Sequence, residues 1–274
     1  MKAEKKTEKK TVIFYFTGTG NNMYVAKRIQ EQMENVDIYP FHKLKEVADI
    51  VQEYDRIIYC APAYYSHIPP YVAEVLRDIS YGSTKEIITI VGCGGNRGHA
   101  TEDMRTCIEA TGQMVAGEYM VMFPGNYILS YNAFPKLYQK IVLHMADRKI
   151  DRIVKDIEKH TVSVLKKSGI LYSKIWEPSL QKAMASFSDI GQHYDVANTC
   201  NGCGTCAKIC PVQNIQIVDK RPDFSNHCQQ CMACVQWCPT HSIDYRHKAK
   251  SRKHYHHREI SLVDLVKGNI GNQK

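Results

Sequence analysis

The chain has 274 residues, of which 44% are hydrophobic, and a formal net charge of +8 at pH 7. This length favours two domains, and the apolar content is ample for a packed core. The sequence shows neither a signal peptide nor an apolar run of the roughly 20 residues that span a bilayer, so we expect a cytoplasmic protein that has no membrane partner.

The positive charge lies near the two ends of the chain. Residues 1–10 contain five Lys and two Glu, and residues 245–274 contain eight Lys or Arg and two acidic residues. The sequence between them is close to neutral, so we expect solvated basic tails and no nucleic-acid partner. The alternative is a docking arm for an acidic partner or nucleic acid. Within the second tail we expect surface histidines, with metal binding as the alternative, at His254, His256 and His257.

A strand, a glycine-rich turn and a helix open the chain. Residues 11–16 (TVIFYF) lack polar alternation, as expected of a buried parallel strand. Apolar residues at helical spacing follow from Met23 to Met33. The turn between them offers hydroxyl and backbone N–H groups to a phosphate. Its residues are Thr17, Gly18, Thr19, Gly20, Asn21 and Asn22.

The turn lacks the lysine of a Walker loop and the third glycine of a dinucleotide fingerprint, where this chain has Met23. It resembles the T-x-T-G-x-T phosphate loop of flavodoxins, with Asn22 in place of the last threonine. An amide N–H can donate to phosphate as a hydroxyl does. The resemblance implies that the loop binds the terminal phosphate of FMN.

Four more apolar segments predict strands at residues 36–41, 56–62, 86–92 and 117–124. With the first strand they predict an α/β fold, a flavodoxin-like doubly wound sheet of five parallel strands. Such a sheet binds its nucleotide at the carboxyl ends of its strands. The loops after the third and fourth strands are therefore expected to frame the flavin ring.

The predicted ring contacts come from these two loops. Tyr64 or Tyr65 is placed to stack on the ring, with a solvent-facing tyrosine as the alternative. The fourth loop lets its backbone approach the ring edge. The second ring face is left open to a partner cluster, a substrate or Tyr127. The full set is Pro62, Ala63, Tyr64, Tyr65, Gly92, Cys93, Gly94, Gly95, Asn96 and Tyr127.

Beyond Pro135 the apolar spacing predicts two amphipathic helices, one around residues 137–145 and one around 150–157. The second is expected to close the sheet. The first, with residues 128–131, is expected to be an insertion that borders the flavin. Residues 168–198 predict a connecting segment that packs on both domains.

Eight of the eleven cysteines form two copies of C-x2-C-x2-C-x3-C-P, the motif of bacterial two-cluster ferredoxins. In that motif the fourth cysteine of each copy ligates the other cluster. One [4Fe-4S] cluster is therefore expected on Cys200, Cys203, Cys206 and Cys238, and the other on Cys228, Cys231, Cys234 and Cys210. A pair of zinc sites is the alternative.

The other three cysteines lie in the first half. Cys60 and Cys107 are expected to be small core residues. Cys93 could act as a redox thiol only if its pKa were depressed.

The whole sequence resembles flavodoxin–ferredoxin fusion proteins of anaerobic microbes, which implies one FMN and two [4Fe-4S] clusters. The expected units are a basic tail (1–10), a flavodoxin-like FMN-binding domain (11–167), a connecting segment (168–198), a ferredoxin-like domain (199–246) and a basic His-rich segment (247–274).

The expected function is electron transfer between FMN, the clusters and an external partner, which is either a redox protein or a small-molecule acceptor. One alternative is an FMN-dependent oxidoreductase that reduces a small organic acceptor, with His67 and His99 as acid–base candidates. The other alternative is a zinc-bearing binding module.

Overall fold

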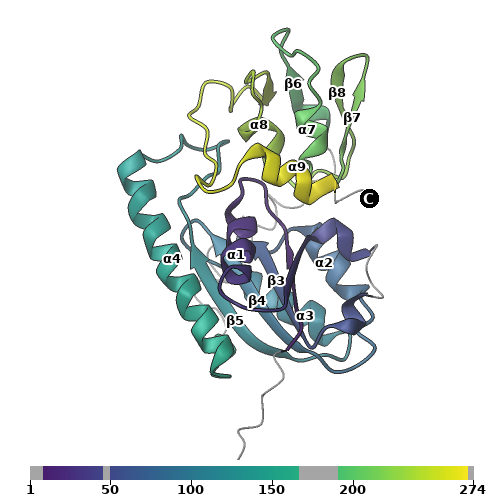
Figure 1. Ribbon diagram of the computed structural model, residues 1–274. Helices are drawn as coiled ribbons and strands as arrows, with labels where there is room; N and C mark the ends of the chain where they lie inside the picture. Colours follow the sequence, from purple (N-terminus) through teal and green to yellow (C-terminus); the bar gives the residue numbers. More distant parts are fainter. Residues whose placement is uncertain (1–8, 46–49, 167–190, 271–274) are drawn as a thin grey trace, which may run out of the picture.

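A computed structural model describes residues 9–45, 50–166 and 191–270 (Figure 1). Most of the predicted N-terminal tail and most of the predicted connecting segment lie outside these residues. None of the helices described there is both long and apolar enough to cross a lipid bilayer.

The first half is built on one sheet of five parallel strands in the order β2-β1-β3-β4-β5, which confirms the predicted flavodoxin-like topology. Every residue of β1 is buried, as its unbroken apolar sequence predicts. The strands are β1 (Thr11–Tyr15), β2 (Val36–Pro40), β3 (Arg56–Pro62), β4 (Glu86–Cys93) and β5 (Val115–Met122).

Helices cover both faces of the sheet, and each face has its own apolar core (Figure 1). Helices α1 (Asn21–Gln30) and α4 (Lys136–Glu158) lie on one face, and α2 (Pro70–Arg77) and α3 (Ala100–Glu109) lie on the other. Two short 3-10 helices, η1 (Phe41–Lys45) and η2 (Ile50–Glu53), follow β2.

The prediction of two helices after Pro135 was wrong, because a single helix of 23 residues, α4, runs from Lys136 to Glu158. The predicted break falls on Ala146-Asp147-Arg148-Lys149, which contains no proline or glycine to end a helix. One buried face runs through both halves of α4 at helical spacing, from Gln139, Val142, Leu143 and Ala146 to Ile150, Ile153, Val154 and Ile157.

The C-terminal half forms a small unit at the carboxyl edge of the sheet (Figure 1). Two antiparallel strand pairs and two short helices surround an apolar core that includes several of the cysteines. The elements are β6 (Tyr194–Val196), α7 (Thr205–Lys208), β7 (Ile215–Val218), β8 (Arg221–Phe224), α8 (Ala233–Gln236) and β9 (Ile243–Tyr245).

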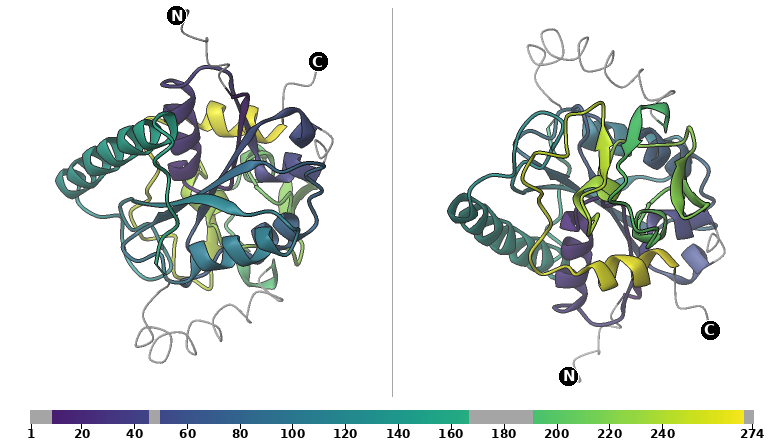
Figure 2. Two further views of the ribbon diagram at one scale, coloured as in Figure 1. Left: turned by 90° about the horizontal axis from the view of Figure 1, so that it is seen from below. Right: turned by 90° about the horizontal axis from the view of Figure 1, so that it is seen from above.

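The expectation of a solvated C-terminal tail was wrong for residues 253–270. This segment returns to the first half, and its helix α9 (Leu262–Ile270) lies beside α1 and β2 (Figures 1 and 2). It buries Tyr255, His257, Ile260 and Leu265. The charged residues among them suggested a solvated tail and obscured the apolar spacing in the sequence.

Candidate functional site

The glycine-rich turn after β1 is held by its own side chains. The hydroxyl of Thr17 accepts a hydrogen bond from the backbone N–H of Gly20, 3.0 Å away, and Gly20 has a φ of 94° that favours glycine. The Asn22 amide donates one N–H to Phe16 O at 2.9 Å, which ties the start of α1 to the end of β1. Its other N–H is left for a ligand.

A cavity of about 260 Å³ lies beside this turn. It collects most of the predicted flavin-site residues: Thr17, Gly18, Thr19, Asn21, Asn22, Pro62, Ala63, Tyr64, Tyr65, Gly92, Cys93, Gly94 and Tyr127. Three other predicted residues, Gly20, Gly95 and Asn96, do not line it. Asn96 is exposed and accepts a hydrogen bond from Gly98 N at 2.9 Å.

A side chain at either of two glycines of this cavity would clash with neighbouring atoms of the chain. A Cβ on Gly92 would lie 2.3 Å from Asn22 Oδ1, and a Cβ on Gly18 would lie 2.4 Å from the carbonyl oxygen of Cys231. The Oδ1 atom of Asn22 is also buried without a hydrogen-bond partner. The hydroxyls of Thr17 and Thr19 accept hydrogen bonds from Gly20 N and Asn126 Nδ2, which leaves each O–H to donate to a phosphate, so the residues fit FMN.

Four tyrosines line the cavity, and three of them, Tyr64, Tyr65 and Tyr127, were predicted to contact the flavin. The Tyr65 and Tyr127 rings meet edge to face with centroids 5.6 Å apart, and their hydroxyls are in contact. The Tyr65 hydroxyl also donates to Gln230 Oε1 at 2.9 Å. Burial raises the pKa of the Tyr64 hydroxyl far above its usual value, and the nearby Cys231 and Cys228 raise it further. Tyr64 therefore lies between the cavity and the cysteines.

Sequence reasoning missed several residues of the cavity. The segment that follows β5 contributes four of them, and only its glycine, proline and aromatic content signalled a binding loop. The cysteine-rich unit contributes three more, which no local pattern could have assigned to a flavin site. These missed residues are Phe123, Pro124, Gly125, Asn126, Gln230, Cys231 and Met232. Tyr131 also lines the cavity and belongs to residues 128–131, which were expected to border the flavin.

The eight motif cysteines form two groups. Cys200, Cys203, Cys206 and Cys238 line one cavity of the C-terminal unit. Burial raises the pKa of the Cys206 thiol to about 11, and Cys238 and Cys203 contribute to the shift. The fourth cysteine of the second copy thus lies with the first three of the first copy.

In the second group Cys210 and Cys234 are buried, and Cys228 and Cys231 are partly buried. Burial raises the pKa of the Cys231 and Cys234 thiols far above the usual value, and the neighbours Cys210 and Cys228 raise both further. Cys210 of the first copy thus lies with the second copy. Both groups therefore have the composition that crossed ligation requires.

Thiolates buried this deeply need nearby positive charge, which iron supplies. Single zinc ions need four ligands converging on one point at about 2.0–2.3 Å. Among the residues that the structure describes, no group of three or more His, Cys, Asp or Glu is placed to hold a single metal ion. The donor set fits iron–sulfur clusters, which spread their thiolates over a wider body.

The two copies of the motif differ at their left-handed backbone positions. The first copy places glycine at both, Gly202 and Gly204, each with a φ of 71°. The second copy places Gln230 (φ 49°) and Met232 (φ 57°) there, although side chains are disfavoured in this conformation by about 1–2 kcal/mol. Both of these residues line the flavin cavity. The second copy is therefore the one whose left-handed residues line this cavity.

The remaining cysteines behave as core residues. Cys60 in β3 and Cys107 in α3 are buried, as predicted. Cys93 borders the flavin cavity, but burial raises the pKa of its thiol. A reactive thiol needs a lowered pKa, so the raised pKa of Cys93 argues against a redox role for it.

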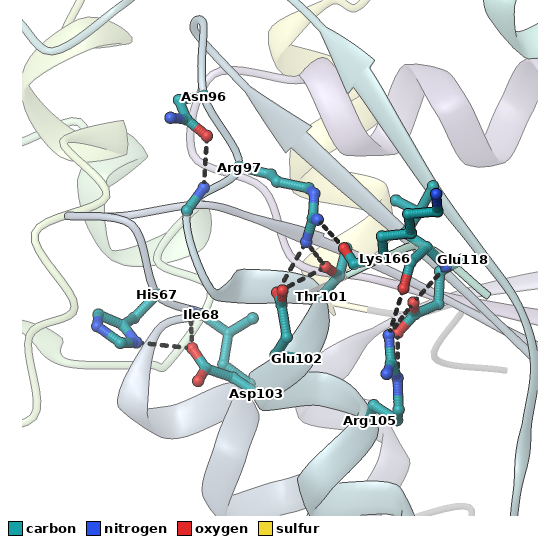
Figure 3. A network of polar contacts seen from close by, with 12 residues as sticks. His67, Ile68, Asn96, Arg97, Thr101, Glu102, Asp103, Arg105, Glu118 and Lys166 are labelled. Carbon is teal, nitrogen blue, oxygen red and sulfur yellow. Dashed lines mark hydrogen bonds and ion pairs between the residues drawn. The ribbon is translucent and has the colours of Figure 1, made fainter. Parts of the chain in front are cut away.

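Neither histidine proposed for acid–base chemistry lines the flavin cavity. The Nδ1 atom of His67 lies 2.9 Å from Asp103 Oδ2 (Figure 3). The His99 ring stacks on His67 with centroids 5.7 Å apart. The neighbouring charges are structural, since Arg105 pairs with the buried Glu118 and Arg97 pairs with Glu102 (Figure 3).

The C-terminal segment covers the turn from outside. The backbone N–H of His257 donates to Thr19 O at 2.9 Å, and the Tyr255 hydroxyl donates to Asn21 Oδ1 at 2.9 Å. The His257 ring stacks on Tyr24 with centroids 3.9 Å apart. Burial, and to a smaller extent Arg258, lowers the pKa of His257 to about 3, so this histidine is neutral at pH 7.

Comparisons with solved structures give related folds of low identity. The chain is similar to Fusobacterium nucleatum flavodoxin bound to flavin mononucleotide, with 14% identity over 56% of this chain and 99% of that chain and a TM-score of 0.40. It is similar to two-electron reduced Megasphaera elsdenii flavodoxin, with 21% identity over 50% of this chain and 97% of that chain and a TM-score of 0.35. It is also similar to rubredoxin oxygen:oxidoreductase from the anaerobe Desulfovibrio gigas, with 18% identity over 53% of this chain and 36% of that chain and a TM-score of 0.35. The search of curated proteins found no match.

Family profiles match both halves of the chain. The profile of the flavodoxin domain matches residues 12–152, and that of the 4Fe-4S dicluster domain matches residues 193–239. Together these domains give the chain an FMN and iron–sulfur electron-transfer or oxidoreductase role. Because the first match covers more than half of the sequence, the chain belongs to the flavodoxin domain family, in the form of a flavodoxin–ferredoxin fusion.

Proposed function

We propose that this protein passes electrons between an external redox partner and its FMN through two [4Fe-4S] clusters, in a reducing cytoplasm where its cysteines stay free to bind iron. When bound, FMN exchanges one or two electrons and each cluster exchanges one. Thr17, Thr19 and the backbone of the turn would hold the FMN phosphate. The two cysteine groups would each hold one cluster.

The observation that carries this proposal is the position of Cys231. This residue is one of the second cysteine group and also lines the flavin cavity, and its carbonyl oxygen touches the turn at Gly18. Met232 beside it closes the same wall. One wall of the cavity is thus formed by the chain's own cysteine-rich unit.

The two cysteine groups have different surroundings, which supports different roles. None of the first group lines the flavin cavity, and its Cys203 is exposed to solvent. In the second group Cys234 is buried, and Cys231 faces the flavin. The first group is therefore the one accessible from outside, and the second is the internal one.

The alternative of an oxidoreductase for a small acceptor gains no support from the cavity, since both candidate histidines lie outside its lining. The two readings differ in what oxidises the reduced flavin. A carrier passes electrons to a protein partner, whereas such an oxidoreductase turns over steadily with a small acceptor alone.

The test is anaerobic purification followed by flavin and iron assay and stepwise reduction monitored by absorption and EPR. We expect one FMN and about eight irons per chain, which is the content of two cubane clusters. Cys231→Ser should slow flavin reoxidation by an oxidant that reaches only exposed iron–sulfur centres, whereas the exposed variant Ser130→Ala should not. Protein that contains neither iron nor flavin would refute the proposal.

A further inference from the structure

Six apolar side chains lie exposed along the start of α4 and the segment before it. We call them the apolar face, and they are Tyr131, Phe134, Leu137, Tyr138, Ile141 and Met145. Leu137, Ile141 and Met145 are 73%, 54% and 52% exposed, and their spacing of four residues aligns them on one side of the helix. Single exposed apolar residues are ordinary, but a row of this length marks an interaction surface.

A basic segment lies directly beside the apolar face. The backbone N–H of Ala133 donates to Lys253 O at 3.0 Å, and the N–H of Lys253 donates to Asn132 Oδ1 at 2.8 Å. The Arg252 side chain donates to Ile128 O at 2.7 Å. These contacts join residues 128–133 to residues 252–253, so the two segments that contain them, 128–145 and 245–258, lie beside each other at that point.

This surface carries positive charge without compensation from its own segments. The two segments together contain eight Lys or Arg and no Asp or Glu, which equals the net charge of the whole chain. Lys136, Lys140, Lys248, Lys250 and Lys253 are all exposed. A surface of this kind attracts an acidic partner and repels a basic one.

The apolar face continues into the wall of the flavin cavity. Tyr131 lines that cavity, and its ring lies 5.5 Å from the ring of Phe134 at the start of the apolar face. A Cβ on Gly125, another cavity residue, would lie 2.7 Å from the Tyr131 hydroxyl. A protein seated on the apolar face would therefore stand at the edge of the flavin site.

We propose that the apolar face and its basic border are the docking surface for an acidic electron-transfer protein, whose carboxylates surround an apolar centre. This proposal rests on the proposed electron-transfer function, because it gives that function its external partner. A second copy of this chain is a poorer occupant. A symmetric pairing would place two acid-free basic surfaces against each other, and like charges oppose association.

The test measures the binding of the holoprotein to an acidic plant-type [2Fe-2S] ferredoxin, used as the probe, at low and high salt. We expect Lys136→Glu/Lys140→Glu to weaken binding about tenfold at low salt and to reduce its salt dependence. Leu137→Ser/Ile141→Ser should weaken binding at both salt concentrations. The matched control is Lys155→Glu/Lys159→Glu, at the other end of α4, and should bind like the unmodified protein.

Three results would overturn the proposal. The first is ferredoxin binding that none of these variants changes, or no binding at all. The second is binding to phosphatidylglycerol vesicles that both surface variants lose, which would assign the face to a membrane. The third is a dimer in sedimentation that Leu137→Ser/Ile141→Ser dissociates. Binding needs no electron transfer, so normal FMN and iron content without binding refutes the docking surface alone, whereas binding without cofactors refutes the proposed function alone.

Discussion

The indole Nε1–H of Trp237 donates a hydrogen bond to the carbonyl oxygen of Gly18, 3.0 Å away. Trp237 belongs to the cysteine-rich unit, and Gly18 belongs to the phosphate turn. The indole ring also stacks on His256 with ring centroids 4.1 Å apart. One buried side chain therefore links the flavin domain, the cysteine-rich unit and the C-terminal segment.

Trp237→Phe should separate the packing of this ring from its hydrogen bond. Phenylalanine keeps an aromatic surface but leaves the Gly18 carbonyl without its donor, and a buried unpaired acceptor costs about 1–3 kcal/mol. Urea unfolding of the holoprotein should show a loss of that size with unchanged iron content. Unaltered stability would mean that water or a backbone shift replaces the donor.

Gly18→Ala should weaken FMN binding. Its Cβ would lie 2.4 Å from the Cys231 oxygen, so the phosphate turn and the cysteine-rich unit must move apart. We expect the Kd for FMN to rise about tenfold or more, a change of about 1.4 kcal/mol. Gly95→Ala is the matched control, since a Cβ at Gly95 meets nothing within 4 Å. Equal affinities in the two variants would contradict the close contact.

Cys238→Ser and Cys210→Ser should each damage the cluster of the other motif copy, although Cys238 belongs to the second copy and Cys210 to the first. Cys238 lies with Cys206 and Cys203, whereas Cys210 lies with Cys231. EPR of the reduced protein should therefore show that Cys238→Ser alters the cluster of the first motif copy. Cys210→Ser should alter the cluster beside the flavin. If each substitution instead damaged the cluster of its own motif copy, crossed ligation would be refuted.

His257 should make the protein less stable in mild acid. Its pKa is about 3 in the fold and about 6.5 when it is exposed, so below pH 6.5 the unfolded chain binds a proton that the folded chain does not. Stability is thus complete above pH 6.5 and falls as the pH decreases toward 3. Chemical unfolding between pH 7.5 and 5.5 should show this slope in the unmodified protein and a smaller one in His257→Phe. Identical slopes would exclude the histidine as the cause.

Glu118→Gln should destabilise the flavodoxin domain strongly. Glu118 is buried and accepts hydrogen bonds from Arg105 Nε at 2.9 Å and from Leu165 N at 2.8 Å. The neutral amide leaves the Arg105 charge unpaired in a partly buried site, and breaking a buried pair costs about 3–5 kcal/mol. Thermal unfolding should show the loss, with the exposed Glu158→Gln as control. A loss no larger than that of the control would show that solvent screens the pair.

The flavodoxin fold could be predicted because its signals are local. Each of the five strands is an apolar segment such as TVIFY, and observed and predicted strand limits differ by two residues at most. The single helix α4 was harder. Its polar residues around Asp147 suggested a break, yet helix continuity depends on backbone compatibility, which those residues satisfy.

The site was predictable where one short segment makes it. Thr17 to Asn22 and the cysteine motifs carry their chemistry in their own spacing. The wall made by Gln230 and Met232 could not be predicted, because it depends on how two distant halves of the chain meet. The burial of His257 depends on the same long-range contact.

The position of residues 253–270 has a consequence for the order of assembly. These residues leave the ribosome after the whole of the first half, yet they close over Thr19 and Asn21. The sheet is complete more than 100 residues earlier, at β5. A nascent chain whose sheet has formed therefore still has an unfinished cavity, and the cavity is closed only once residues 253–270 have emerged and packed on the turn.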